Sequence, residues 1–430
     1  MGEPTVAADP PVSPTPGAPV PAEGAGQRAS SGVAGGAESN GAESGGARSG
    51  AAAVPHRDRP ELPGLPGQPR LVDQHCHSVV GSELAAGRFA SLLTESDRPP
   101  ALGASPWDSA VGLAVRRWCA PELGLPPFAP AEAYLERRRE LGVAEATRVL
   151  LRAAGLGACL VDTGLTQAAG VPLLSPEELG GVAQADVHEV VRIEYVAEQA
   201  VSPGTGAHEW AAIVGDALRS AAARAVGLKS VVAYRCGLDF EPRRPAPAEV
   251  ANAAALHLAS GSDRLAHPVL LRHLLWEALE LGLPLQLHTG FGDPDLVLHR
   301  SDPSLLTGFI RAAEPYGTPL VLLHGWPYHR QAAWLAQAFP HVYCDLGLTL
   351  THVGAGARRV LAETLELAPF HKLLFSTDAY GLPELYLVGV AAFADALDAW
   401  LGEAVPAEAE AARIAALVAG GNARRLYRLP

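Results

Sequence analysis

The chain carries little positive charge, few cysteines and no Cys-x-x-Cys pair. Its 33 Lys and Arg stand against 46 Asp and Glu, which gives a formal net charge of −13. Nucleic-acid binding needs clustered basic side chains that neutralise phosphates, so this balance excludes a nucleic-acid partner. The five cysteines are scattered and odd in number. Such usage favours a reducing cytoplasm over a disulfide framework.

The amino-acid sequence also lacks signals for membrane insertion or export. No apolar run is expected to be long enough to span a membrane, and the N-terminal residues lack the apolar core of a signal peptide. Met1-Gly2 begins like an acylation signal, but Val6 stands where such a signal requires Ser or Thr. We therefore expect a cytoplasmic protein without a membrane partner.

The first 67 residues contain almost no large apolar side chains. Ala, Gly, Pro, Ser and Glu dominate this stretch, which cannot bury enough surface to offset its ordering entropy. We predict a disordered tail over residues 1–67, either a passive extension or a docking segment, and one folded domain over residues 68–430. The Pro- and Gly-rich run from Pro60 to Pro69 would form the hinge between them.

From Leu71 onward, short apolar runs alternate with amphipathic helical patterns. Hydrophobic residues make up 48% of the chain, which is ample for a large core. Helical spacing follows the runs, as in Pro268–Leu281 and Ala357–Leu367. This alternation predicts an α/β fold, a (β/α)8 barrel of the TIM type. The predicted strands are Leu71–His75, Ala158–Thr163, His188–Tyr195, Leu228–Ala233, Leu283–His288, Pro319–His324, Val342–Asp345 and Leu373–Asp378.

The stretch over residues 82–154 is too long for a simple connection between the first two strands. It contains Trp107, Trp118 and a strong helical run over Pro130–Ala154. We predict a helical insertion after strand one that covers the barrel mouth and forms part of the active-site wall.

The most specific motif is Asp73-Gln74-His75-Cys76-His77, directly after the first apolar run. Side chains alternate along a strand, so His75 and His77 point the same way and make half of a metal site. Carboxyl ends of parallel barrel strands meet at one face, where the chemistry gathers. The candidates at the ends of four further strands are Lys229, His288, His324 and Asp378.

Single polar residues near strand ends are more often structural. We expect a plain hydrogen-bonding role for Asp345, as a loop cap, and for four other histidines. These are His188, His299, His329 and His352. Six candidates on five strands at the same end, however, indicate a site.

Together these motifs resemble the amidohydrolase superfamily. The resemblance runs from about Leu71 to Leu426 and includes Ser-Thr-Asp-Ala at residues 376–379 and the ending Gly421–Tyr427. The segment Gly227–Arg235 is similar to the branch that includes the amidohydrolase-like domain fused to glutamine synthetase-like proteins. Members hydrolyse C–N, C–O or P–O bonds, and some branches decarboxylate or isomerise, so the fold alone does not select the reaction.

The residue types also indicate which metals the site would bind. Neutral imidazoles and carboxylates suit Zn²⁺, Mn²⁺ or Fe²⁺, and zinc is our first choice. His75, His77 and Asp378 could hold one metal, while His288 and His324 could hold a second. Two nearby dications would need an anionic bridge.

Lys229 is the candidate for that bridge. A Lys in an apolar strand has a lowered pKa, and its neutral amine can take up CO₂ as a carbamate. Binuclear members of the superfamily use a strand-four Lys in this way. Only Lys229 and Lys372 among the 33 basic residues are Lys, and Arg cannot form this carbamate. The other explanation is that the two lysines were retained by drift. If the strand ended at Arg235, Lys229 would lie too deep in the barrel.

The same residues suggest a mechanism. Asp378 would accept a proton from metal-activated water and return it to the leaving amine. Asp73 and Thr377 are candidates to hold the imidazoles in place. Two further groups could contact substrate. Arg192 and Arg235 could grip a carboxylate, unless ion pairs such as Arg192–Glu194 engage them, and Tyr234 and Trp326 could line the pocket.

We therefore expect a metal-dependent amidohydrolase that cleaves an amide or related C–N bond of a small molecule with metal-activated hydroxide. One alternative is a single-metal non-oxidative decarboxylase of the same superfamily. Another is a catalytically silent metal-binding scaffold, against which the complete ligand set, Asp378 included, argues. Whether the chain forms a homo-oligomer stays open.

Overall fold

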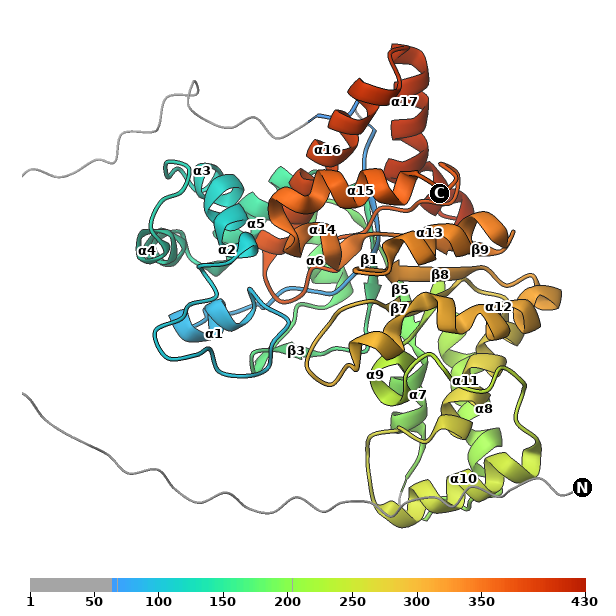
Figure 1. Ribbon diagram of the computed structural model, residues 1–430. Coiled ribbons are helices and arrows are strands. Elements are labelled where there is room, and N and C mark those ends of the chain that lie inside the picture. The colour runs from blue at the N-terminus through green and yellow to red at the C-terminus, as the bar shows by residue number, and fades with distance from the viewer. Residues whose placement is uncertain (1–63, 68, 203) are drawn as a thin grey trace, which may run out of the picture. The chain divides into compact units, whose positions relative to one another are not determined.

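The computed structural model describes residues 64–67, 69–202 and 204–430 (Figure 1). Most of the tail predicted over residues 1–67 lies outside these residues. Leu65, however, is 8% exposed and belongs to the hydrophobic core. The packed chain therefore includes Leu65, which the prediction had assigned to the tail.

A seven-stranded parallel sheet forms the centre of the domain. Its strand order follows the chain, and every neighbouring pair is parallel. The predicted fold class, an α/β barrel of the TIM type, is confirmed. The strands are β1 (Val72–Cys76), β2 (Ala158–Asp162), β5 (Asp186–Arg192), β6 (Gly227–Ser230), β7 (Leu285–Thr289), β8 (Leu320–His324) and β9 (Val342–Cys344).

The segment over residues 372–379 closes the curled sheet between β9 and β1. On one side, Leu374 N donates to Cys344 O at 2.9 Å. On the other, Gln74 N donates to Phe375 O at 3.1 Å, and Asp378 N donates to His75 O at 3.0 Å. The predicted eighth strand, Leu373–Asp378, therefore lies where expected, but only a single bridge, Cys344 to Leu373, has regular strand pairing.

Two strands, β5 and β6, end three residues earlier than predicted. The prediction His188–Tyr195 is wrong at its end, because helix α7 (Ile193–Ala200) begins directly after β5. The prediction Leu228–Ala233 is wrong in the same way, because α9 (Val232–Cys236) follows β6. Apolar residues that suit a strand also suit the buried first turn of a helix, and tertiary packing decides between them. Lys229 consequently lies one residue before the end of its strand, at the barrel mouth.

Helices cover the outside of the barrel (Figure 1). Helix α11 (Pro268–Leu281) has the predicted bounds, and α15 (Ala357–Leu365) ends two residues before the predicted Leu367. The other covering helices are α6 (Pro176–Ala183), α8 (Trp210–Ala222), α10 (Pro247–Ser260), α12 (Thr307–Ala313), α13 (His329–Ala338), α14 (Gly347–His352), α16 (Pro383–Ala404), α17 (Glu408–Ala416) and α18 (Asn422–Tyr427). A small hairpin of β3 (Gln167–Ala168) and β4 (Val171–Pro172) follows β2.

The predicted insertion after β1 is helical. It contains α1 (Ala86–Ser91), α2 (Ala110–Ala114), the π-helical turn η2 (Val115–Cys119), α3 (Ala120–Glu122), α4 (Ala131–Leu141) and α5 (Val143–Ala154). The single run predicted over Pro130–Ala154 is two helices, because Gly142 has a φ of 77°, which glycine adopts without steric cost. Arg138 Nε pairs with Glu384 Oε1 at 2.6 Å, and this buried contact ties α4 to the first turn of α16.

Helix α16 is long and apolar enough to cross a membrane by length and composition alone. The prediction that no apolar run is long enough to span a membrane did not identify this helix. It contacts α5, α14 and α15 within the domain, and 67% of its most apolar window is buried there. Burial in the domain core accounts for its apolar character.

Candidate active site

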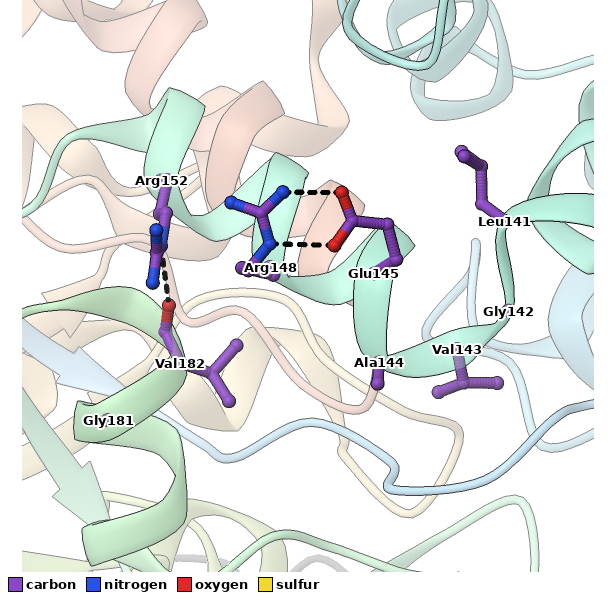
Figure 2. Close-up of a pocket in the computed structure, with 9 residues that line it drawn as sticks. All are labelled: Leu141, Gly142, Val143, Ala144, Glu145, Arg148, Arg152, Gly181 and Val182. Atoms are coloured by element: carbon purple, nitrogen blue, oxygen red, sulfur yellow. Dashed lines mark hydrogen bonds and ion pairs between the residues drawn. The ribbon is translucent and has the colours of Figure 1, made fainter.

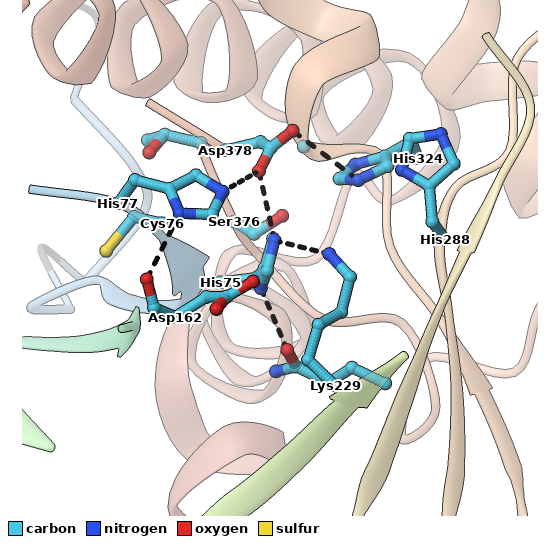
Figure 3. Close-up of polar contacts among 12 residues, drawn as sticks. His75, Cys76, His77, Asp162, Lys229, His288, His324, Ser376 and Asp378 are labelled. Atoms are coloured by element: carbon cyan, nitrogen blue, oxygen red, sulfur yellow. Dashed lines mark hydrogen bonds and ion pairs between the residues drawn. The ribbon is translucent and has the colours of Figure 1, made fainter. Parts of the chain in front are cut away.

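Six polar side chains predicted to form the site meet at the carboxyl ends of the barrel strands (Figure 3). They come from β1, β6, β7, β8 and the closing segment, which are far apart in the sequence. They are His75, His77, Lys229, His288, His324 and Asp378. All are buried except Asp378, whose side chain is 12% exposed.

Asp378 lies at the centre of this group. Its Oδ1 is 3.0 Å from His75 Nε2 and 3.4 Å from His77 Nε2, and its Oδ2 is 3.5 Å from His324 Nε2. One atom each of His75, His77 and Asp378 lies within 4.8 Å of the others. Ligands about 2.0–2.1 Å from a tetrahedral ion are about 3.3 Å apart, so these separations match those around one metal.

Hydrogen bonds on the far side of each ring decide which nitrogen faces Asp378 as an acceptor. His75 Nδ1 is 2.8 Å from Gln286 Oε1. The amide nitrogen of Gln286 donates to Gln74 O at 2.7 Å, so Oε1 is the acceptor and His75 Nδ1 carries the proton. His77 Nδ1 is 3.2 Å from the carbonyl of Asp162, which can only accept. Both Nε2 atoms therefore present lone pairs to a carboxylate.

His77 Nε2 and Asp378 Oδ1 are both acceptors with no proton between them, so they repel each other unless a cation lies there. The ring nitrogens of His324 support the same reading, because neither has a hydrogen-bond partner among the described residues although the side chain is 0% exposed. Buried polar atoms without partners are rare and require an explanation. The donor set thus fits a bound divalent metal by its chemistry and by its unmet bonding capacity.

Lys229 and His288 extend the group towards β6 and β7. Lys229 Nζ is 2.9 Å from His75 Nε2, and the His288 and His324 rings are 4.8 Å apart. His288 Nε2 is 3.1 Å from the carbonyl of Phe291. His288 therefore has Nδ1 left for a ligand.

Burial controls the charge of these groups. It lowers the pKa of His75 to about 4 and that of His288 to about 3, and it lowers the pKa of His324 as well. Burial also lowers the pKa of Lys229. Desolvation penalises each charged form, so the imidazoles stay neutral, as metal ligands must be.

Two of the converging residues have unusual backbone conformations. His324 has a φ of 67° and Asp378 a φ of 52°, a region that costs energy for residues other than glycine. Asp345 Oδ1 accepts His324 N at 2.6 Å, and Thr349 Oγ1 donates to His324 O at 2.9 Å. These bonds from the end of β9 and from α14 hold His324 in its strained position.

Sequence comparison gives a family. The sequence profile of the amidohydrolase family matches residues 168–429, more than half of the chain. The chain belongs to the amidohydrolase family. Protein fluG of Emericella nidulans is 34% identical over 239 residues, which are 51% of this chain and 27% of fluG. The chain therefore spans only about a quarter of that relative's length.

Solved structures show the same fold. A Lactobacillus casei ATCC 334 protein described as a candidate metal-dependent hydrolase has a TM-score of 0.73 and 27% identity, over 84% of this chain and 96% of that one. A glucuronate isomerase from Caulobacter crescentus has a TM-score of 0.57 and 13% identity, over 88% of this chain and 97% of that one. A uronate isomerase from Bacillus halodurans C-125 has a TM-score of 0.55, with 13% identity over 86% and 94% of the two chains. The two isomerases share the fold with this amidohydrolase.

The arginines predicted to grip a substrate carboxylate are engaged by carboxylates of the chain. Arg192 donates to Asp162 Oδ2 from Nε at 3.1 Å and from Nη2 at 2.7 Å. Arg235 Nη2 is 3.2 Å from Glu198 Oε1. The ion pair Arg192–Glu194 that the sequence suggested is not the contact these residues form. Arg192 pairs with Asp162, and Glu194 Oε1 accepts a hydrogen bond from Val231 N at 3.0 Å.

The structure places Tyr234 and Tyr380 beside candidate metal ligands and Trp326 against Phe291. The Tyr234 ring is 4.4 Å from the His288 ring, so it lies beside the site. The Trp326 ring packs on Phe291 at 5.6 Å, edge to face. Tyr380, from the closing segment, contacts the edge of His77 at 5.7 Å.

Four other residues noted in the sequence have structural partners. Asp73 accepts Thr377 N at 2.9 Å and Thr377 Oγ1 at 2.5 Å, so the pair joins β1 to the closing segment rather than holding an imidazole. His329 Nε2 pairs with Glu363 at 2.7 Å. Lys372 donates to the carbonyls of Ala336 and Phe339, which caps the end of α13 and accounts for the second lysine.

A cavity of ≈ 1260 Å³ opens onto Asp378. Its wall comes largely from the insertion, including Glu95, and also from Asp293 after β7, His352 of α14 and Tyr380. Sequence reasoning missed Glu95 and Asp293, and it treated His352 as structural. No local signal marks these residues, because loops from separate parts of the chain bring them together.

A second hollow, of ≈ 550 Å³, lies between α5 and α6 (Figure 2). Its charged groups are paired: Arg148 Nε donates to Glu145 Oε2 at 2.7 Å, and Arg152 Nε donates to Val182 O at 3.4 Å. It contains none of the six candidate metal ligands. The cavity over Asp378 is therefore the better candidate for ligand binding in this family member.

Proposed function

We propose that this amidohydrolase cleaves an amide or related C–N bond of a small molecule with the help of a divalent metal. The observation that carries the proposal is the pair of Nε2 lone pairs of His75 and His77 that face the Asp378 carboxylate at 3.0 and 3.4 Å. The similarity to the candidate metal-dependent hydrolase of Lactobacillus casei supports the same reaction class.

His75, His77 and Asp378 would hold one divalent cation, with zinc as the first choice. His288 and His324 would hold a second, bridged to the first by Lys229. Such a metal supplies a Lewis acid that lowers the pKa of water and polarises a substrate carbonyl.

Asp378 is the group of the chain that moves the proton. Its Oδ1 is buried and accepts no hydrogen bond from the described residues, so it has free lone pairs. It would take the proton from the attacking water and give it to the nitrogen as the C–N bond breaks. Tyr234 would shield this region from bulk water by covering the face of His288.

Lys229 would serve as a carbamate. Its side chain is buried, and burial lowers the pKa of its amine, which keeps a neutral nucleophile available. The nitrogen bonds to the carbon of CO₂, one C=O electron pair moves to oxygen, and a proton leaves to solvent. The product would be an anion with two oxygens, which would supply the negative charge that two nearby dications need.

We also place the protein in the cytoplasm and give it a small molecule as its partner. All five cysteines are free, and four of them are buried. Thiols that are not paired suit a reducing compartment.

The proposal is tested by metal analysis and by an amide-hydrolysis screen on the full chain. We expect bound zinc, manganese or iron after expression, release of free amine from at least one small amide, and loss of release after chelation that the metal restores. Release of CO₂ from a carboxylated aromatic compound, without amide cleavage, would instead favour the decarboxylase. Metal binding with neither reaction would favour the silent scaffold.

A further inference from the structure

Gln286 is a polar side chain in the interior of the barrel. It comes from β7, two residues before His288, so the two side chains point to the same face of the strand. Gln286 is 0% exposed. A leucine of similar size would avoid the cost of burying an amide, and buried polar groups are stable only when their hydrogen bonds are formed. The use of glutamine here therefore requires partners for both ends of its amide.

The amide nitrogen of Gln286 faces three acceptors. It lies 2.7 Å from the backbone oxygen of Gln74, 3.0 Å from Gln74 Oε1 and 2.8 Å from the hydroxyl oxygen of Tyr427. Tyr427 donates to Gln74 Oε1 at 2.6 Å, and Gln74 Nε2 donates to Asp345 Oδ2 at 2.5 Å. A backbone carbonyl and a carboxylate only accept, so these contacts fix the orientation of both amides. They leave Gln286 Oε1 directed at His75.

Tyr427 reaches these amides from α18, the last helix of the chain. Its ring belongs to a hydrophobic cluster that includes Val72, Leu160 and Val321. A Cβ atom built on Gly227 would lie 2.9 Å from Tyr427 Cε1, so the ring occupies space that a side chain at residue 227 would need. The C-terminal segment therefore supplies a buried hydroxyl to the two glutamines.

The orientation of Gln286 decides between the two neutral forms of His75. Asp378 Oδ1 lies 3.0 Å from His75 Nε2, close enough to accept a hydrogen bond from a protonated Nε2. That form would leave no lone pair on Nε2 for a cation. Gln286 Oε1 is 2.8 Å from Nδ1 and competes for the single proton from the opposite side of the ring. Lys229 Nζ does not decide between them, because the neutral amine that burial favours can donate or accept.

We propose that Gln286 is a positioning residue for metal binding: it holds the proton of His75 at Nδ1 and fixes the ring, which keeps Nε2 free for a divalent cation. Gln74 and Tyr427 hold the amide in the orientation that this role requires. The inference rests on the metal ligation in the proposed function and is independent of the bond that this amidohydrolase cleaves.

Two substitutions of Gln286 separate positioning from structural support. Gln286→Leu and Gln286→Glu both remove the amide nitrogen that donates to Gln74 and Tyr427, so both should lower the melting temperature. Only Gln286→Glu keeps an oxygen for His75 Nδ1. The zinc dissociation constant of the full chain, measured by competition with a chelator, should rise about 10–100-fold in Gln286→Leu, as for other partners of histidine ligands. It should not rise in Gln286→Glu.

Thr318→Val is the control for a lost buried hydrogen bond. Thr318 Oγ1 donates to Leu279 O at 2.7 Å, before the start of β8 and so at the opposite end of the barrel from the site. The substitution should lower the melting temperature and leave the zinc dissociation constant unchanged.

Nitrogen NMR of isotope-labelled histidine in the metal-free chain gives a readout that needs neither zinc nor turnover. His75, assigned by the signal that disappears in His75→Ala, should carry its proton on Nδ1 in the wild type and in Gln286→Glu. In Gln286→Leu the proton should move towards Nε2. Unchanged zinc affinity in Gln286→Leu, or an equal loss in both variants, would overturn the positioning role. The expected changes without cleavage of any amide would support it, and the proposed hydrolysis alone would fail.

Discussion

The amine of Lys229 lies 2.9 Å from Nε2 of His75, across the barrel from the strand that carries the histidine. The two residues are 154 positions apart in the chain. The amine is therefore next to the atom that would bind the first metal, and a carbamate formed on it would extend into the metal site.

Lys229→Ala should lose at least one metal per chain, because the bridge between the two ligand groups disappears. Labelled bicarbonate should produce one carbamate signal by carbon NMR in the wild type and none in the variant. Lys229→Arg should fail equally, since guanidinium does not take up CO₂. Added short carboxylates should restore part of the activity of Lys229→Ala.

Lys372→Ala is the matched control, since it removes the only other lysine of the chain. It should lower stability through the lost helix cap and leave metal content and the carbamate signal unchanged. One tightly held metal per chain in both the wild type and Lys229→Ala would contradict the binuclear arrangement and would favour a single-metal enzyme.

Asp378→Asn should lower turnover by about two to four orders of magnitude, because the amide keeps the size of the side chain but cannot act as the base. Part of the metal should stay bound through the histidines. The measurement is kcat on any amide that the wild type cleaves, at saturating metal. Near-normal turnover would show that another group moves the proton.

Asp345→Asn should lower the free energy of unfolding by about 3 kcal/mol, since about two buried donors lose their acceptor. The carboxylate accepts Gln74 Nε2 at 2.5 Å, Ser376 Oγ at 2.6 Å and His324 N at 2.6 Å. Urea denaturation measures the change, and exposed Asp398→Asn is the control. Unchanged stability would show that the asparagine finds equivalent partners.

Glu194→Gln should become more stable relative to the wild type as the pH rises above the ordinary glutamate pKa of about 4. Burial is the largest influence on the pKa of Glu194, and it raises that pKa above its ordinary value. The folded state therefore binds the proton more tightly than the unfolded state, and the wild type loses stability as the carboxyl ionises. Glutamine keeps the acceptor for Ser230 Oγ and Val231 N without the charge. A stability difference that does not change with pH would show that the carboxyl does not titrate in this range.

Removal of residues 1–63 should leave the melting temperature and metal content nearly unchanged, because the segment lacks a core-forming pattern. Removal of residues 1–67 should lower the melting temperature, since Leu65 packs in the core and burial of a leucine contributes about 1.5–3 kcal/mol. Thermal denaturation of the two truncated chains separates these effects. A large loss in the shorter truncation would show that the tail supports the barrel.

Local patterns in the sequence were enough to predict the barrel and the position of its chemistry. Apolar runs that alternate with helical spacing lead to parallel strands, and parallel strands place their carboxyl ends at one face. This geometry brings His75, His288 and His324 together, whatever the details of each loop. Because the signals are local, α11 has the predicted bounds, and the predicted end of α15 differs by only two residues.

The tertiary structure decided what no local pattern contains. Strands β5 and β6 end early because the residues that follow pack as helices, and Gly142 divides a run that looked continuous. The contact with Gln286 decides which ring nitrogen of His75 carries the proton, and Asp162 forms an ion pair with Arg192. Both contacts join different strands. Glu95 and Asp293 share a cavity although an insertion and a distant loop supply them. In each case the outcome depends on which side chain lies opposite another after the barrel closes, and the spacing of residues along the chain does not determine it.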